Sequence, residues 1–225
     1  MNGKLLLSVI MNTAIVLMVA AGLVISFTAR GDTSTFQGDR LGIFIYFTVD
    51  SNVLCAIVSA IYVYLALRHK NAADIPKAGY VLRLVSTVGV LVTLFVTVFF
   101  LAPSAKGGLP ALLTNANFFF HLVVPLTSIV SFALFEGTEV IGFRDCLWGI
   151  APVFLYSVFY AGRILANLDG GKVVPSYDFY GFLKGGVQFL PLVLIIMYSF
   201  SYVLAVSSMG LNRLGLWVSN GHSGK

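Results

Sequence analysis

Six long apolar stretches constrain the fold of this 225-residue chain more than any other feature of its sequence. An α-helix needs about 20 mostly apolar residues to cross the hydrocarbon core of a bilayer, and each stretch reaches that length. The stretches cover residues 5–29, 43–67, 79–101, 112–135, 147–166 and 187–209. The sequence therefore predicts an all-α, polytopic membrane protein, in which six transmembrane helices form one bundle and one domain over residues 1–225.

The composition agrees with a membrane protein. Of all residues, 58% are hydrophobic and 10% are charged, whereas a soluble domain carries about 25% charged residues. The net charge is +5, but the 14 Lys and Arg residues lie singly or in small groups between apolar runs, without a basic stripe. This pattern excludes a disordered chain, a coiled coil, a conventional cytosolic enzyme and a nucleic-acid-binding protein. Because the connections are too short for a soluble domain, we expect the function within or at the edge of the bilayer.

Basic residues predict the orientation in the membrane. Lys4 precedes the first stretch, but the apolar run is longer than the roughly 7–15 residues of a signal peptide, so we expect a retained helix. More Lys and Arg residues fall on the side of the two termini than on the other side, with Arg68, Lys70 and Lys77 as the strongest local signal. The positive-inside rule then places both termini in the cytoplasm. We expect an integral, multi-pass protein, in the cytoplasmic membrane if the source is prokaryotic.

The residues that most often bind metals are few and scattered. Two cysteines, Cys55 and Cys146, are too few for a disulfide framework or a zinc site, and we expect inert buried thiols. The three histidines fall in different regions: His69 in a connection, His121 within an apolar stretch and His222 in the tail. We therefore expect neither a metal nor a cofactor.

Ionisable residues inside the apolar stretches are informative because each costs at least a few kcal/mol in a bilayer. The second stretch contains Asp50 and the fourth contains His121. Arg83 and Arg163 lie near helix ends, from which their side chains can reach the lipid headgroups. For Asp50 we expect a structural role, either an ion pair with Arg163 or a hydrogen bond to a neighbouring helix. The alternative is that Asp50 orients His121.

Polar residues gather on single faces of three predicted helices. At 100° per residue these faces comprise Thr48, Asn52, Cys55 and Ser59, with Ser51 at the margin, in the second stretch; Thr114, Asn117, His121 and Ser128 in the fourth; and Tyr156, Tyr160, Arg163 and Asn167 in the fifth. Such residues often do no more than join membrane helices by hydrogen bonds. Three polar faces around one intramembrane histidine indicate a functional site instead.

Thr48 and His121 are the candidate catalytic residues. Both predicted helices run inward from the same side, which puts Thr48 about 8 Å and His121 about 14 Å below the outer boundary. The error in the helix ends allows the two side chains to lie level. A hydroxyl and an imidazole at one depth can act as nucleophile and base.

Two short motifs resemble those of a known family. Phe47–Asn52 reads F-T-V-D-S-N and Phe120–Pro125 reads F-H-L-V-V-P. Their T-x-x-[SI]-N and H-x-x-x-P elements, the chain length and the six spans resemble the androgen-induced/FAR-type six-helix membrane hydrolases and their bacterial relatives. The architecture is similar over the whole chain, whereas the sequence is similar in these two elements alone. The resemblance implies hydrolysis of fatty acid esters of hydroxy fatty acids, with Thr48 as the nucleophile and His121 as the base.

Ester hydrolysis also needs donors for the oxyanion that forms during attack. We expect amide donors from Asn52 or Asn117, or a phenol donor from Tyr156 or Tyr160, because these residues share the polar faces. Burial would keep His121 in the neutral form that a base requires. The expected partners are a long-chain acyl ester as substrate and the surrounding membrane lipids, while the sequence leaves the oligomeric state open.

Two other functions remain open at this stage. A small transporter or channel would use Asp50, His121 and Arg163 as a polar relay. A non-catalytic lipid-binding protein would keep the bundle without the chemistry. Neither alternative needs an activated hydroxyl, so a covalent probe for such a group separates them from the hydrolase.

Overall fold

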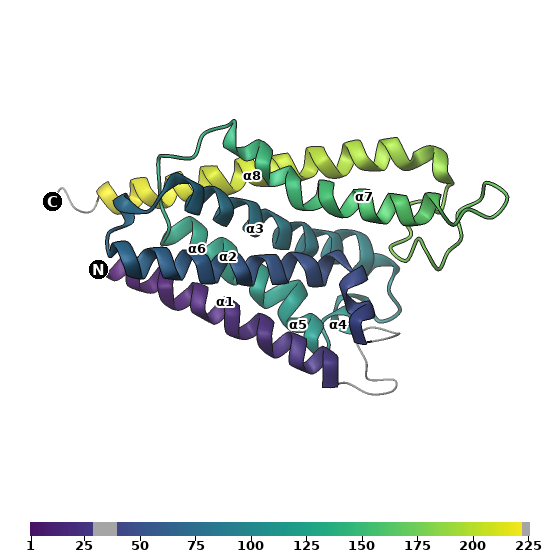
Figure 1. Cartoon of the computed structure of the whole chain (residues 1–225), viewed down its shortest axis with the longest axis horizontal. Helices are drawn as coiled ribbons and strands as arrows, with labels where there is room; N and C mark the ends of the chain where they lie inside the picture. Colours follow the sequence, from purple (N-terminus) through teal and green to yellow (C-terminus); the bar gives the residue numbers. More distant parts are fainter. Residues whose placement is uncertain (29–39, 222–225) are drawn as a thin grey trace.

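Six helical spans that are long and apolar enough to cross a membrane make up the computed structural model, which describes residues 1–28 and 40–221 (Figure 1). Four of the spans contain α1 (Gly3–Thr28), α2 (Phe47–His69), α3 (Lys77–Phe95) and α6 (Val124–Leu134), and the other two contain α7 (Ala151–Leu165) and α8 (Leu190–Gly221). The expected all-α bundle of six spans is therefore confirmed.

Shorter helical elements extend or connect these spans. They are η2 (Arg40–Ile45), η3 (Ala72–Asp74), η4 (Val96–Leu101), η5 (Ala102–Ser104), α4 (Gly108–Leu112), α5 (Ala116–Phe118), η6 (Phe119–Val123), η7 (Asp145–Ile150) and η8 (Val187–Phe189). Two of them, η4 and η6, are π-helical turns within longer helices. Such turns frequently mark functional positions, and η6 contains His121.

Several helix boundaries differ from the sequence prediction. α2 begins at Phe47 rather than at residue 43, because Tyr46 is extended and the residues before it form η2. The fourth span begins at Ala116 rather than at residue 112, since Asn115 has a left-handed φ of 52°. The last helix continues to Gly221 instead of ending at residue 209. Residue 29, the expected end of the first helix, lies outside the described residues.

The two chain ends lie at one end of the bundle (Figure 1). The connection between α7 and α8 lies at the opposite end, together with η2, α4 and the start of α2. An even number of spans requires this arrangement. The candidate residue Thr48 therefore lies at the end of the bundle that is remote from both termini.

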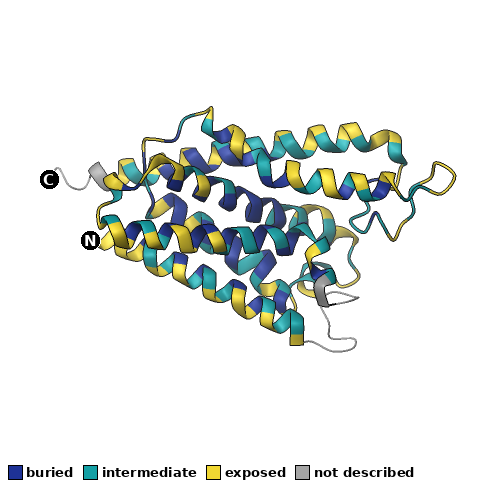
Figure 2. Ribbon diagram, viewed as in Figure 1, coloured by how far each residue is buried: buried dark blue, intermediate teal, exposed yellow. Residues whose placement is uncertain are grey.

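α3 is the central helix, and its residues are buried along most of its length, whereas α1, α7 and α8 expose their outer faces (Figure 2). Those outer faces carry large apolar side chains, for example Leu17, Leu155 and Ile195. Soluble monomers rarely expose apolar patches of this extent. The exposed apolar surface matches a bundle that is surrounded by lipid.

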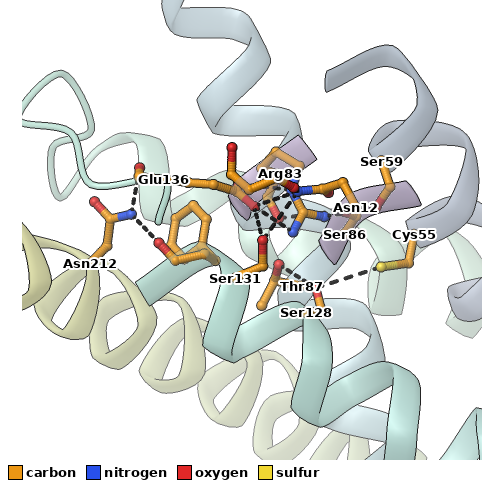
Figure 3. A network of polar contacts seen from close by, with 12 residues as sticks. Asn12, Cys55, Ser59, Arg83, Ser86, Thr87, Ser128, Ser131, Glu136 and Asn212 are labelled. Carbon is orange, nitrogen blue, oxygen red and sulfur yellow. Dashed lines mark hydrogen bonds and ion pairs between the residues drawn. The ribbon is translucent and has the colours of Figure 1, made fainter. Parts of the chain in front are cut away.

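A buried ion pair joins α3 to the residues that follow α6 (Figure 3). Arg83 on α3 donates from Nε to Oε2 of Glu136 at 2.9 Å and from Nη2 to Oε1 at 3.1 Å. Both side chains are shielded from solvent. The expectation that Arg83 reaches the headgroups is therefore wrong, because the guanidinium has a carboxylate partner inside the bundle.

Further hydrogen bonds tie this ion pair to neighbouring helices. Asn12 of α1 and Ser131 of α6 donate to Oε1 of Glu136, at 2.8 and 2.6 Å, and Arg83 donates to Ser59 of α2 at 3.2 Å. Removal of one partner of a buried ion pair is strongly destabilising, because the other charge stays buried without a partner. The stability of the bundle therefore depends on this cluster. The cluster holds α1, α2, α3 and α6 in register.

Candidate active site

Thr48 lies in the first turn of α2, where the backbone N–H groups have no partner within the helix. One of these donors, the N–H of Phe47, donates to the Tyr180 hydroxyl at 2.9 Å. Tyr180 comes from the connection between α7 and α8, so that connection is fixed to the start of α2. The Thr48 side chain is nearly enclosed, with 8% of the residue exposed.

His121 lies in the π-helical turn η6, which leads into α6. Pro125 follows four residues later, and proline has no N–H to donate to the carbonyl of the residue four positions before it. The proline ring also displaces that carbonyl, which accounts for a widened turn at His121. The H-x-x-x-P pattern thus has a local structural reason. His121 is 7% exposed and faces the same interior as Thr48.

The structure brings the two candidate catalytic residues together. Oγ1 of Thr48 lies 3.3 Å from Nε2 of His121. This distance is slightly longer than the roughly 2.6–3.2 Å expected of a nucleophile–base pair and is common before substrate binds. The sequence predicts that this hydroxyl and this imidazole lie at one depth, and in the structure the two groups are in contact.

The contact made by Nδ1 of His121 determines which ring nitrogen carries the proton. Nδ1 of His121 lies 3.2 Å from the Leu112 carbonyl at the end of α4. A carbonyl accepts hydrogen bonds but cannot donate one, so Nδ1 must carry a proton in this contact. In a neutral imidazole, Nε2 is then the free acceptor, and the Thr48 hydroxyl donates to it. This is the tautomer that a general base for Thr48 needs.

Asn52 holds the pair in position and does not offer free donors. Its Nδ2 donates to the Thr48 carbonyl at 2.7 Å and to the Phe120 carbonyl at 3.0 Å. These two bonds join the first turns of α2 to the residue before His121. Because both amide N–H groups are engaged, Asn52 fits a positioning role better than the expected oxyanion role.

The other expected oxyanion donors are also engaged or apart from the pair. Tyr156 donates its hydroxyl proton to the Ile45 carbonyl at 2.7 Å, and Tyr160 donates to Oδ1 of Asp178. Among the described residues, Asn117 makes no side-chain hydrogen bond to Thr48 or to His121. The hydroxyl protons of Tyr156 and Tyr160 are thus already donated elsewhere, and within the described part of the chain Asn117 forms no side-chain hydrogen bond with either residue of the pair.

Tyr180 is a better candidate that the sequence analysis missed. Besides accepting from the Phe47 N–H, Tyr180 lines the same small cavity as Thr48 and Tyr156. Burial raises the pKa of Tyr180 to about 12, so the phenol keeps its proton at neutral pH and can act as a donor. The sequence does contain an indication of this role. The connection is rich in Tyr and Phe, which is unusual for a segment that only faces water.

A small apolar cavity of about 50 Å³ adjoins Thr48. It is lined by residues of α2, α3, α7, α8 and the connection between the last two, and these include Thr48, Val96, Tyr180 and Phe182. The cavity leaves Thr48 between apolar space on one side and His121 on the other. A carbonyl group placed in the cavity would adjoin the Thr48 hydroxyl and the Tyr180 phenol, which both line it.

The expected ion pair between Asp50 and Arg163 does not form. Within residues 1–28 and 40–221, the ion pairs are Lys77 with Asp145 and Arg83 with Glu136. Arg163 packs its guanidinium over the Tyr177 ring, 5.3 Å from the ring centre. Asp50 is half-buried on the opposite side of α2 from Thr48 and lines a groove there.

The polar face of α2 is buried as expected, since Asn52, Cys55 and Ser59 are all enclosed. The face predicted for the fourth span is confirmed for His121 and Ser128 but not for Thr114, which is exposed and precedes the helix.

No hydrogen bond or ion pair in the described part of the chain joins Asp50, His121 and Arg163 into the relay that a transporter would use. Both cysteines are free and buried, as expected, and His222 lies outside the described residues. No family model, curated protein or solved structure matches this chain.

Proposed function

We propose that this protein is an intramembrane hydrolase of long-chain acyl esters, in which Thr48 is the nucleophile and His121 is the general base. The observation that carries the proposal is the contact of 3.3 Å between Oγ1 of Thr48 and Nε2 of His121. The family resemblance of the two motifs supports the same chemistry. It names fatty acid esters of hydroxy fatty acids as one substrate class.

In the first half-reaction, Nε2 of His121 takes the hydroxyl proton while Oγ1 of Thr48 attacks the ester carbonyl carbon. The carbonyl oxygen becomes an oxyanion, which accepts a hydrogen bond from the Tyr180 phenol. The carbon–oxygen bond to the alcohol then breaks, and the protonated His121 gives its proton to the leaving alcohol. The product of this step is an acyl ester of Thr48.

In the second half-reaction, a water molecule replaces the alcohol. His121 takes a proton from the water as the resulting hydroxide attacks the acyl carbon, and the Tyr180 phenol again donates to the oxyanion. The bond to Oγ1 of Thr48 breaks, the proton returns from His121 to Oγ1, and the fatty acid leaves. Because the start of α2 lies at one end of the bundle, the path for water is short.

The orientation belongs to the same proposal. With both termini in the cytoplasm, as the positive-inside rule favours, the catalytic pair lies in the outer half of the membrane. In a prokaryotic source the protein would reside in the cytoplasmic membrane.

Covalent labelling tests the nucleophile directly. A fluorophosphonate probe reacts with an activated hydroxyl, and peptide mass spectrometry locates the modified residue. We expect the label on Thr48, no label in Thr48→Ala and at least tenfold slower labelling in His121→Ala. Thr87→Ala is the matched control, since Thr87 is a buried threonine that bonds to Ser128 away from the site. Labelling at another residue, or equal labelling in Thr48→Ala, would contradict the proposal.

A further inference from the structure

A groove of about 340 Å³ runs between α2 and α7, beside the candidate active site. Its walls are mostly apolar and include Phe44, Leu54, Leu155 and Phe159. Leu155 is 68% exposed on the outer surface of the bundle, so the groove opens sideways toward the lipid. The volume lies within the range of roughly 300–1,000 Å³ that is typical of small-molecule sites.

Two aromatic rings separate the groove from the cavity that adjoins Thr48. Phe47 and Tyr156 line both spaces, and their rings meet edge to face with centres 5.2 Å apart. These two rings form a wall that the groove and the cavity share. The groove is therefore placed to receive a lipid that approaches Thr48 from within the bilayer.

One polar group in the groove has no partner. Asp50 forms no ion pair and no side-chain hydrogen bond within the part of the chain that the structure describes. The other polar side chains of the lining are engaged, Ser51 with Thr93 at 2.9 Å and Tyr156 with the Ile45 carbonyl. An unpaired carboxylate at this depth is costly, which makes it a functional candidate.

The chemistry of the lining selects the kind of headgroup. A carboxylate accepts hydrogen bonds from hydroxyl groups, and the described lining contains no Lys, Arg or His that could pair with a phosphate or a carboxylate. A phospholipid headgroup would leave its phosphate unpaired, and a free fatty-acid carboxylate would face the like charge of Asp50. A neutral headgroup with free hydroxyls has no phosphate that needs a partner and no charge that Asp50 would repel.

We propose that the groove between α2 and α7 binds acyl esters whose alcohol carries free hydroxyl groups, as in a monoacylglycerol. In the bound ester, one of these hydroxyl groups donates a hydrogen bond to Asp50. The inference rests on the proposed function, because the bound ester is a substrate only if Thr48 and His121 cleave it. It changes the substrate that the family resemblance implies, because a fatty acid ester of a hydroxy fatty acid ends in a carboxylate that Asp50 repels.

Binding of non-hydrolysable ligands tests the groove independently of catalysis. The ligands are 1-O-oleylglycerol, an ether with two free hydroxyls, and oleate, which has a similar chain and a carboxylate. Affinities for the full-length protein in detergent are measured by native mass spectrometry at neutral pH. We expect wild type to bind oleylglycerol at least tenfold more tightly than oleate. Equal or tighter binding of oleate would overturn the inference without any variant.

Two substitutions separate charge from hydrogen bonding at Asp50. Asp50→Leu removes both and should weaken oleylglycerol binding at least fivefold. Asp50→Asn keeps an acceptor but removes the charge, and should tighten oleate binding at least fivefold. Asp74→Asn is the matched control, because Asp74 is exposed in η3. If folded Asp50 variants keep the wild-type preference, the inference is wrong.

The two proposals fail in different ways. If oleylglycerol binds with the expected dependence on Asp50 but no ester is cleaved, the hydrolase proposal fails and the groove assignment stands. If esters are cleaved at Thr48 but the ligand preference does not depend on Asp50, the groove assignment fails and the hydrolase proposal stands.

Discussion

Oγ1 of Thr48 lies 3.3 Å from Nε2 of His121, although 73 residues separate the two in the sequence. The contact joins the start of α2 to a π-helical turn in the fourth span, inside an apolar bundle. The Leu112 carbonyl fixes the far side of the imidazole. The hydroxyl, the imidazole and the orientation of the imidazole thus come from three separate segments of the chain.

Removal of the Asn52 side chain should loosen this contact. Asn52 donates to the carbonyls of Thr48 and Phe120, and Asn52→Ala leaves both without that donor. We expect a loss of about 1–3 kcal/mol in unfolding free energy and a fall in kcat of at least tenfold with little change in KM. Thermal unfolding in detergent and steady-state ester hydrolysis measure the two effects. Asn167→Ala, at a half-buried asparagine beyond the end of α7, is the control.

Tyr180→Phe should impair catalysis with a smaller effect on binding. The substitution removes the phenol that lines the same cavity as Thr48, and loss of one oxyanion donor typically costs about 10²–10³-fold in kcat. The measurement is kcat and KM for a long-chain ester in both proteins. An unchanged kcat in Tyr180→Phe would remove Tyr180 from the mechanism.

The pKa of Tyr180 also sets an expectation for the pH profile. Because burial raises that pKa to about 12, the phenol stays protonated from neutral pH to about pH 10. Activity should therefore not fall through ionisation of Tyr180 in this range, and should be lost only as the pH rises toward 12. Initial rates between pH 7 and 10.5 test this point. A decline near pH 9–10 in wild type that is absent from Tyr180→Phe would show that the phenol ionises early.

Gly22 on α1 gives room to the Phe120 ring, which precedes His121. A Cβ atom at Gly22 would lie 2.5 Å from Cε1 of Phe120. Gly22→Val should therefore displace Phe120, destabilise the bundle by about 1–3 kcal/mol and lower kcat at least tenfold. Gly210→Val is a matched control, because nothing lies within 4 Å of a Cβ at Gly210. Equal activity in both variants would mean that His121 does not depend on the packing of Phe120.

The ion pair between Arg83 and Glu136 should behave as one unit. Arg83→Met or Glu136→Leu alone leaves an unpaired buried charge, and we expect each to cost about 3–5 kcal/mol in stability. The double variant should be less destabilised than the sum of the two, because it leaves neither charge. Thermal unfolding of the four proteins completes a double-mutant cycle. Additive losses would contradict a coupled pair.

Hydrophobic length and helical periodicity were enough to predict much of this structure. The six spans follow from apolar runs, and the buried side of α2 follows from the spacing of Asn52, Cys55 and Ser59. These features depend on residues close in the sequence. The same arithmetic placed Thr48 and His121 at similar depth and on inward faces.

Contacts between distant segments could not be predicted in this way. Periodicity shows which side of a helix faces inward but not which neighbouring helix that side contacts. For this reason the predicted ion pair between Asp50 and Arg163 is wrong, and the partner of Arg83 could not be predicted. Glu136 follows the last apolar residue of its stretch and was assigned to a connection, although the bundle encloses it. Tyr180 was missed for the same reason, because a connection has no periodicity from which its contacts follow.

Hydrolysis by purified variants shows whether Thr48 and His121 form a catalytic pair. Wild type, Thr48→Ala, His121→Ala and the control Thr87→Ala are purified in detergent and compared on a panel of long-chain esters. The panel includes monoacylglycerols and fatty acid esters of hydroxy fatty acids. We expect that wild type and Thr87→Ala cleave at least one ester, while the other two lose about 10³-fold or more in rate and remain folded. Full activity in Thr48→Ala, or no turnover of any ester by folded wild type, would contradict this expectation.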